Sequence, residues 1–254
     1  MTLPKIIMQT WKDTHIPLIW QSSPVSIKKF MPNYTYILST DADNRKFVST
    51  HFPDFLSTYD NYKHSIQRAD AIRYMWLYIH GGIYIDLDYQ LLKPLHDLFE
   101  SNSPFYVVYS KNVGTFVTNS FMASQPRCPF WLDVITEMKK AANRYYFGKH
   151  LQVMNTTGPM MLTRVLRRTQ IPYTVLPTSS LIPCSVCDLP CKPIGNSYLQ
   201  VLPGSSWIGF DSRCYNFVLC HWRGLIWILI ILFILLILAV IYWSRCRAKY
   251  FNTN

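Results

Sequence analysis

The sequence predicts one α/β domain followed by a single membrane-spanning helix, and three observations support this. Short β-branched and aromatic segments alternate with segments of helical periodicity, which is typical of α/β domains. Half of the 254 residues are apolar and 15% are aromatic, so a sizeable core can form. An uninterrupted apolar run at residues 225–243 lies near the C-terminus.

The first sixty residues are expected to supply two strands and two helices. A Ser-Thr-Asp segment ends the second strand, and Asp41 is expected to cap the helix that follows. Pro53 separates this helix from the next one. The predicted strands are residues 5–8 and 34–38, the loop after the first strand is 9–11, and the helices are 41–51 and 56–59.

The most regular helical pattern covers residues 66–79, where apolar residues recur at helical spacing. Gly81 and Gly82 follow and give the backbone the freedom that ends a helix. The next three residues, Ile-Tyr-Ile at 83–85, predict a strand that runs directly into Asp86-Leu87-Asp88. Residues 89–92 are expected to continue extended.

The second half of the chain predicts further strands at 105–109 and 120–123 and helices at 129–146 and 158–168. Residues 172–220 are rich in proline and cysteine and contain short extended pieces such as 198–202. We therefore expect a domain over residues 1–220, a membrane helix at 224–243 and a short basic tail at 244–254.

The apolar run has the length of a membrane span, because nineteen helical residues rise about 28 Å. Arg245, Arg247 and Lys249 follow the run, whereas Arg223 alone lies just before it. This asymmetry favours a cytosolic tail and a luminal domain, in a Golgi, ER or equivalent membrane. Insertion as a tail-anchored protein would instead leave the domain in the cytosol. Interfacial aromatic residues lie near both ends of the run: Trp222, Trp227, Tyr242 and Trp243.

The net charge of +11 comes from scattered basic residues without a run of five, which argues against a nucleic-acid partner. Among the seven cysteines, Cys184, Cys187 and Cys191 are closely spaced. With Cys214 they fit a zinc site, local disulfides or free thiols, and the spacing does not choose among these. Cys246 lies beside the predicted membrane helix, where palmitoylation is an option.

Asp86 and Asp88 are the centre of the functional prediction. Alternate strand positions face the same side of a sheet, so the two carboxylates are expected side by side. Such a pair repels unless a cation or a donor intervenes. Mn²⁺ and Mg²⁺ prefer oxygen ligands and bridge phosphates. The pair therefore predicts a metal site at a strand end, where α/β sheets bind ligands.

Asp70 and Arg73 lie three residues apart on the preceding helix and thus share one face. Ile66 and Ala69 lie on the same face, which favours burial of the pair near the two aspartates. An ordinary surface ion pair is the alternative.

Two segments, QRADAIRY at residues 67–74 and YIHGGIYIDLD at 78–88, resemble the DXD sugar-binding region of glycosyltransferase family 32. That family includes inositol phosphoceramide mannosyltransferases, initiating α-1,6-mannosyltransferases and glycolipid α-1,4-galactosyltransferases. The resemblance covers residues 4–211. Further similar segments are IIMQTW at 6–11, NSFMA at 119–123, Thr157-Gly158-Pro159, and GSSW at 204–207 with Asp211 beyond. Met8 and Ile208 stand where the family usually has histidine, and the missing histidine at 208 puts a third metal ligand in doubt. His221 is a candidate for that ligand, with an interfacial His-Trp pair as the alternative.

The resemblance implies a GT-A fold, retention of anomeric configuration and specific residue roles. Asp88 would ligate the metal, and Asp86 would contact the donor ribose and the metal's water shell. Asp70 and Arg73 would hold the donor sugar and phosphates. The remaining implied donor-binding residues are Tyr84 near the ribose, Trp11 on the base, Asn119 near the transferred sugar, and Trp207.

The implied function is transfer of a hexose from a nucleotide-diphosphate sugar, GDP-mannose being favoured over a UDP-hexose. The acceptor would be a membrane-associated lipid such as inositol phosphoceramide, which a C-terminal anchor would keep close. Elongation of a protein-linked or glycolipid glycan is an alternative within the same class. A non-catalytic partner protein with this fold is the alternative from another class.

Overall fold

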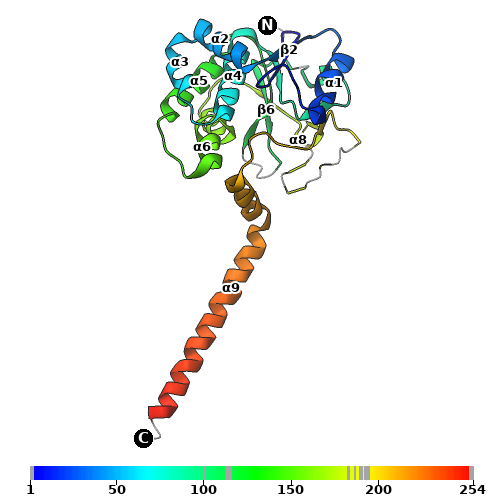
Figure 1. Cartoon of the computed structure of the whole chain (residues 1–254). Helices are drawn as coiled ribbons and strands as arrows, with labels where there is room; N and C mark the ends of the chain where they lie inside the picture. Colours follow the sequence, from blue (N-terminus) through cyan, green and yellow to red (C-terminus); the bar gives the residue numbers. More distant parts are fainter. Residues whose placement is uncertain are drawn as a thin grey trace. The chain divides into compact units, whose positions relative to one another are not determined.

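The computed structural model describes residues 3–99, 101–111, 116–181, 184, 185, 187, 188, 191 and 195–251. The chain divides into two compact units, Met1–Asp211 and Ser212–Asn254 (Figure 1). The predicted limits of the domain, membrane helix and tail stay predictions. Residues 212–220, which we placed in the domain, belong to the long C-terminal helix of the second unit.

The first unit is built on a six-stranded mixed sheet with the strand order β2-β1-β3-β6-β5-β7. Three strands at one side of the sheet are parallel, β2 (Thr35–Ser39), β1 (Ile6–Thr10) and β3 (Gly82–Ile85). β6 (Val117–Ser124) runs antiparallel to both β3 and β5 (Phe105–Tyr109), and β7 (Thr174–Leu176) runs parallel to β5. A small second sheet pairs β4 (Tyr89–Leu91) with β8 (Leu199–Val201).

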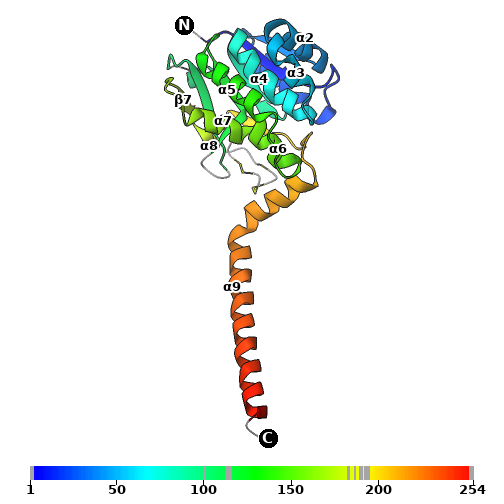
Figure 2. The same cartoon turned by 90° about the vertical axis from the view of Figure 1, so that its left-hand side faces the viewer.

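Helices cover both faces of the main sheet (Figures 1 and 2). On one face lie α1 (Ser22–Phe30) and α8 (Thr178–Leu181), and short 3₁₀ turns occur at Leu18–Trp20 and His96–Phe99. The larger helical layer, which faces the viewer in Figure 2, contains α2 (Asp41–His51), α3 (Pro53–Asp60), α4 (Ser65–His80), α5 (Pro129–Ala141), α6 (Gly148–Thr156) and α7 (Pro159–Leu166).

The alternation of side chains along the strands divides the core into two apolar clusters. Ile7, Ile83 and Ile85 face the α1 side, whereas Met8 and Tyr84 face the larger helical layer. All five side chains are almost fully buried. Each side therefore has its own packed interior, and the central strands β1 and β3 are held from both faces.

Gly81 and Gly82 end α4 and start β3 with a turn that other residues fit poorly. Their φ angles are 66° and 83°, in the region that favours glycine. A Cβ atom on Gly82 would lie 2.5 Å from the carbonyl oxygen of Ile6 on β1. This close approach sets β3 against β1, and it places the residues after Ile85 at the edge of the sheet.

The α/β class is confirmed, and most predicted elements occur with shifted ends. Gln9 and Thr10, expected in a loop, extend β1 because both pair with β2. Thr40, rather than Asp41, caps α2: its hydroxyl accepts from the N–H of Asp43, whose carboxylate accepts in return from the N–H of Thr40.

The predicted helix 129–146 is wrong in length, since α5 ends at Ala141. The residues that follow, Asn143 and the aromatic Tyr145, Tyr146 and Phe147, have low helix propensity, and Gly148 with φ 78° starts a separate helix, α6. Helices α1, α6 and α8 and strand β7 were not predicted.

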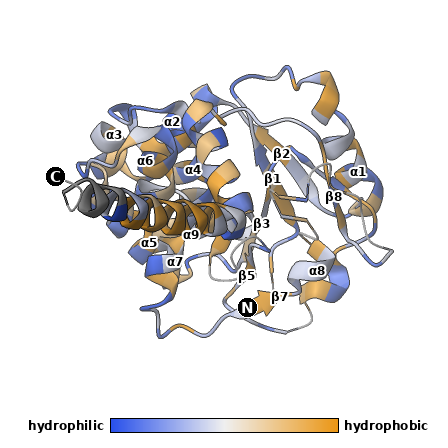
Figure 3. Cartoon of the chain, turned by 90° about the horizontal axis from the view of Figure 1, so that it is seen from below, coloured by the Kyte–Doolittle hydropathy of each residue, from blue (hydrophilic) through white to orange (hydrophobic). Residues whose placement is uncertain are grey.

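The second unit is the helix α9 (Phe210–Phe251). Its segment Phe210–Arg245 is long and apolar enough to cross a membrane. Figure 3 shows hydrophobic residues along the middle of this helix, and the large apolar side chains from Ile226 to Trp243 are exposed at nearly every position, so this part has no polar face. A helix without a polar face buries poorly against a single domain but suits a bilayer, so α9 is a candidate membrane span.

The cysteine pattern favours the disulfide alternative. Cys184 and Cys191 form a disulfide bond, which removes both thiolates from the zinc site considered above. Cys128 is free and buried, and Cys214 is free and exposed. Among the described residues, no group of three or more histidine, cysteine, aspartate or glutamate side chains is arranged to hold a metal ion.

The glycine turn makes a testable prediction about stability. Gly82→Ala is expected to lower the free energy of unfolding by about 2 kcal/mol or more, because the new Cβ meets the Ile6 carbonyl at an unfavourable φ. Urea unfolding of the full chain in detergent measures this. Gly195→Ala is the matched control, since a Cβ there meets no atom within 4 Å. Equal midpoints for the two variants would contradict the packing argument.

Candidate functional site

The carboxyl ends of the parallel strands β1 and β3 meet at one edge of the sheet, beside a cavity of about 540 Å³. Trp11 follows β1, and Asp86 follows β3. Every site residue predicted in the first unit lines this cavity, which we call the DXD cavity: Trp11, Asp70, Arg73, Tyr84, Asp86, Asp88, Asn119 and Trp207. The fold thus brings together residues that lie far apart in the sequence.

Asp86 and Asp88 follow the end of β3, as we expected, but they lie in the turn to β4 and do not continue the alternation of the strand. The N–H of Tyr89 donates to the carbonyl oxygen of Asp86 at 3.2 Å, which closes this turn. Strand alternation therefore does not explain why both aspartates reach the cavity. The turn does so, and it is anchored to β6 because the N–H of Asp86 donates to the carbonyl oxygen of Ser120.

Gln9, on β1, holds the same turn through a side-chain hydrogen bond. Its side chain is fully buried in β1, and its amide nitrogen donates to Ser23 Oγ at 2.8 Å and to the carbonyl oxygen of Asp86 at 3.2 Å. The Tyr36 hydroxyl donates to Gln9 Oε1. The amide is thus satisfied on both ends, and it fixes the backbone from which Asp86 projects.

Arg73 holds the cluster together from α4. It is 3% exposed, and its Nη1 donates to Asp86 Oδ1 at 3.0 Å and to the carbonyl oxygen of Asn119 at 2.8 Å. Its Nη2 lies 3.1 Å from Asp70 Oδ1. Its guanidinium carbon also lies 4.6 Å from the centre of the Tyr84 ring. The surface ion pair considered from the sequence is excluded, because Asp70 is only 4% exposed.

Asp70 is the best-satisfied carboxylate of the site. Besides the contact with Arg73, its Oδ1 accepts from the Asn119 amide and its Oδ2 accepts from the Thr157 hydroxyl, both at 2.9 Å. Burial raises the pKa of Asp70 to about 6, and Arg73 opposes this rise. The Tyr74 hydroxyl accepts from the same Asn119 amide and donates to the carbonyl oxygen of Thr157. The network orients Asn119 toward the cavity wall.

Asp88 differs from Asp86 in having an unsatisfied oxygen. Asp86 Oδ1 accepts from both Arg73 and the Tyr84 hydroxyl, the latter at 2.6 Å. Asp88 Oδ1 is buried and has no hydrogen-bond partner among the described residues. Burial, followed by the negative charge of Asp86, raises the pKa of Asp88 to about 7. A buried carboxylate oxygen without a donor is unfavourable unless a cation completes the site.

These two carboxylates fit a Mg²⁺ or Mn²⁺ ion, which commonly takes one or two carboxylates and completes its shell with water and substrate phosphates. A third protein ligand is not seen among the described side chains. His221 belongs to the second unit, where its Nδ1 lies 2.9 Å from the carbonyl oxygen of Phe217 and its ring stacks on the Phe217 ring. Its role as a metal ligand stays a prediction.

Tryptophan side chains form another wall of the DXD cavity. Trp11 packs edge-on against Trp20, with ring centres 5.1 Å apart, and its buried Nε1 has no partner among the described residues. Trp20 Nε1 donates to the carbonyl oxygen of Pro203 at 3.0 Å. Lys149 Nζ donates to the carbonyl oxygen of Trp207 at 2.7 Å. The segment that contains Ser205 and Ser206 is thereby held along the cavity.

Four residues of the site had no role predicted from the sequence: Gln9, Tyr74, Thr157 and Lys149. A structural role for Gln9 could have been predicted from the sequence, because a polar residue within an apolar strand needs buried hydrogen-bond partners. Thr157 belonged to a recognised segment, but its partner Asp70 is 87 residues away. Lys149 lies on a helix that was not predicted, so nothing in the sequence indicated that it would line the cavity.

The chain matches the family model described as a glycosyltransferase sugar-binding region containing a DXD motif, over residues 18–106. It is 34% identical to inositol phosphoceramide mannosyltransferase 3 of Schizosaccharomyces pombe, covering 87% of this chain and 60% of the relative. It is 35% identical to mannosyl phosphorylinositol ceramide synthase CSH1 of Saccharomyces cerevisiae, covering 83% and 54%. The chain therefore spans little more than half the length of these curated relatives.

A viral relative and a solved structure extend the comparison. An uncharacterized glycosyltransferase, L373 of Acanthamoeba polyphaga mimivirus, is 29% identical, with 85% of this chain and 88% of the relative covered. The PaToxG glycosyltransferase structure superposes with a TM-score of 0.50 at 20% identity, covering 65% of this chain and 69% of that one. This likeness confirms the GT-A glycosyltransferase fold that the family resemblance implied. The chain belongs to the family of glycosyltransferases whose sugar-binding region contains a DXD motif.

Proposed function

We propose that this chain is a retaining hexosyltransferase that transfers mannose from a nucleotide-diphosphate sugar, GDP-mannose in the first instance, to inositol phosphoceramide. The observation that carries the proposal is the unsatisfied Asp88 oxygen beside a firmly held Asp86 in a cavity of about 540 Å³. Relatives named for mannosylation of inositol phosphoceramide support the choice of sugar and acceptor. A UDP-hexose is the alternative donor, and a protein-linked or glycolipid glycan is the alternative acceptor.

The two aspartates have different roles in binding the donor. Asp88 presents a free oxygen to a divalent cation, and Asp86, whose Oδ1 is held by Arg73 and Tyr84, lines the same cavity. A bound Mn²⁺ or Mg²⁺ would offset the negative charge that develops on the departing nucleotide diphosphate. Trp11 offers a partly exposed aromatic face for the base and an unpartnered Nε1 donor.

Arg73 acts mainly through the residues around it. A guanidinium has five N–H donors; three donate hydrogen bonds, one from Nε to the carbonyl oxygen of Ala69 and two from Nη1, and Nη2 is engaged in the ion pair with Asp70. Only the Nη2 side of the guanidinium, which already faces Asp70, is left for a donor phosphate. We therefore assign Arg73 chiefly to positioning Asp70 and Asp86, and only secondarily to direct donor binding, which the resemblance implied.

We also propose that the protein is a single-pass membrane protein of the Golgi or a related membrane, with its domain in the lumen. The Cys184–Cys191 disulfide supports this side of the membrane, since disulfides persist in oxidising compartments. The basic residues after the apolar segment support it independently. The α9 anchor would keep the domain at the surface where a lipid acceptor resides.

Asp88→Asn is expected to abolish Mn²⁺-dependent hydrolysis and transfer of GDP-mannose, because an amide cannot replace the charged ligand. In metal-free buffer at pH 8 the variant should be at least as stable as the parent. The pKa of Asp88 is about 7, so at pH 8 its carboxylate in the parent is mostly charged, buried and without a hydrogen-bond partner for Oδ1. The neutral amide of the variant avoids this unfavourable burial of charge. Turnover measured against Mn²⁺ concentration and thermal melting test both parts. Asp133→Asn, an exposed position on α5, is the control. Metal-stimulated turnover at parental rate would remove the metal assignment.

Arg73→Lys is expected to lower kcat/KM for the donor by about tenfold or more, because one ammonium cannot reach Asp70, Asp86 and the Asn119 carbonyl together. Steady-state kinetics with GDP-mannose measure the change. Arg45→Lys is the matched control, since Arg45 forms an exposed pair with Asp60 away from the cavity. If the two variants show the same kcat/KM, the positioning role is wrong.

The luminal placement predicts N-glycosylation at Asn33, in the exposed sequon Asn33-Tyr34-Thr35, in a eukaryotic host. Asn155 carries a second sequon but lies in α6, where its amide donates to the carbonyl oxygen of Leu151, so we expect it to stay unmodified. Glycosidase treatment of parent and Asn33→Gln proteins gives the readout. An unmodified parent whose domain is digested by protease in sealed microsomes would establish the cytosolic orientation instead.

A further inference from the structure

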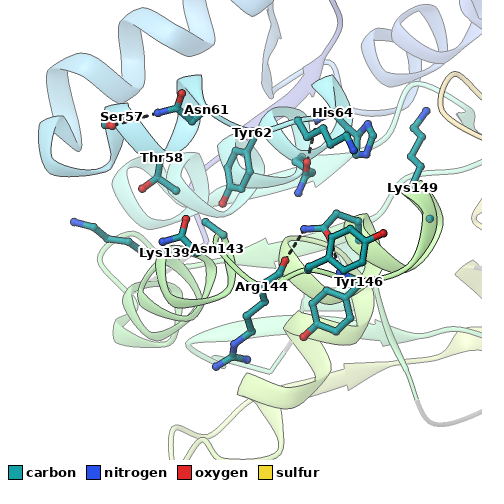
Figure 4. A pocket seen from close by; sticks show the side chains of 16 residues that line it. Ser57, Thr58, Asn61, Tyr62, His64, Lys139, Asn143, Arg144, Tyr146 and Lys149 are labelled. Carbon is teal, nitrogen blue, oxygen red and sulfur yellow. Dashed lines mark hydrogen bonds between the residues drawn. The ribbon is translucent and has the colours of Figure 1, made fainter.

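A second cavity of about 660 Å³ lies between the end of α3, the start of α4 and the α5–α6 connection (Figure 4). We call it the basic cavity, because four cationic side chains line it and none of its described lining residues is acidic. The cationic residues are Lys63, Lys139, Arg144 and Lys149. The proposed binding of the donor does not use this cavity.

The positive charge of the basic cavity is only partly neutralised by the protein. Arg144 lies 3.6 Å from Glu137, and Lys139 donates to the carbonyl oxygen of Asp54. Lys63 makes no hydrogen bond or ion pair among the described residues. Burial, and then the positive charges of Lys149 and Lys63, lower the pKa of His64, and the negative charge of Asp211 opposes them with a smaller effect. Both ammonium groups therefore act on the same small region. Such a region favours an anionic ligand.

The rest of the lining fits a hydroxylated ligand. Asn61, Asn143 and Gln152 supply amides, and Ser57 and Thr58 supply hydroxyls. Tyr62 is 6% exposed, and its buried hydroxyl has no partner among the described residues. In Figure 4 the Tyr62 ring points from the α3–α4 side toward Asn143 and Arg144. A buried hydroxyl without a partner indicates that a further polar group completes the site.

The basic cavity adjoins the DXD cavity. Lys149 lines both. Ser65 and Val153 line the DXD cavity, whereas the adjacent His64 and Gln152 line the basic cavity. One ligand can therefore present a hydroxyl to the donor while its charged part lies beside Lys149 and Lys63.

The loop between α5 and α6 indicates a lipid as the source of this ligand. Tyr145, on the cavity wall, is 81% exposed, and the neighbouring Phe147 is 84% exposed. Exposed aromatic side chains beside basic residues are typical of protein surfaces at the water–lipid interface. A soluble phosphate would not require them.

We propose that the basic cavity binds the phosphodiester-linked polyol headgroup of the anionic lipid acceptor, with Lys63 and Lys149 at the phosphate and the Tyr62 hydroxyl at the polyol. This identification of the occupant as the acceptor rests on the proposed function. The cavity, its charge and its unpartnered hydroxyl do not depend on it.

The test uses the full chain in nanodiscs of neutral phosphatidylcholine and the soluble probe glycerophosphoinositol, with affinity measured by calorimetry. We expect the probe to bind at least about tenfold more tightly than myo-inositol or inorganic phosphate, because only the probe combines charge with hydroxyls. Lys63→Glu should weaken binding about tenfold or more, Lys63→Arg should retain it, and Tyr62→Phe should weaken it roughly threefold to tenfold. Lys140→Glu, an exposed position beside Lys139 but outside the cavity, is the matched control for charge.

Equal affinity of Lys63→Glu and Lys140→Glu for the probe would overturn the inference, as would inorganic phosphate binding as tightly as the whole headgroup. A different result would refute the proposed function. A chain that binds the probe but transfers no hexose from any sugar nucleotide refutes the transferase and leaves the headgroup site standing. Transfer by Lys63→Glu with the parental KM for the lipid acceptor refutes only the headgroup site.

Discussion

The site depends on one buried guanidinium. Arg73 is almost completely removed from water, and a charge in that position is strongly unfavourable unless it is paired and hydrogen-bonded. Here two carboxylates, two backbone carbonyls and an aromatic face surround it. These groups come from α4, β3 with the turn that follows it, and β6. Satisfying one cation therefore locks three elements into a single arrangement.

The two aspartates of the DXD motif have different environments as a result. Asp86 is constrained by Arg73, Tyr84 and, through its backbone, Gln9. Asp88 is left with an unsatisfied buried oxygen. A rigid carboxylate beside an unsatisfied one suits cation binding, since the first keeps its geometry while the second gains most from the ion. This asymmetry would be lost if both carboxylates were held by protein donors.

The starts of α4 and α6 contribute to both cavities, so donor and acceptor sites would share the same rigid supports. Lys149 is held by the Trp207 carbonyl while it lines both spaces. A shared wall provides a physical basis for aligning a headgroup hydroxyl with a donor sugar, because correct orientation of two substrates contributes much of a transfer rate. The same arrangement suits an acceptor that is delivered from a membrane surface.

The sequence by itself determined the α/β class, the apolar C-terminal helix and the positions of Asp70, Arg73, Asp86 and Asp88, because these follow from local patterns: strand and helix periodicity, a glycine turn and a short motif. Only the tertiary structure decided how those residues meet. The aspartates reach the cavity through a turn held by Gln9 and Ser120, not through strand alternation. Thr157 meets Asp70, and Lys149 meets Trp207, across long stretches of chain. Such contacts depend on the packing of α6 and β6 against α4 and on buried polar groups finding partners, and no local pattern in the sequence encodes either.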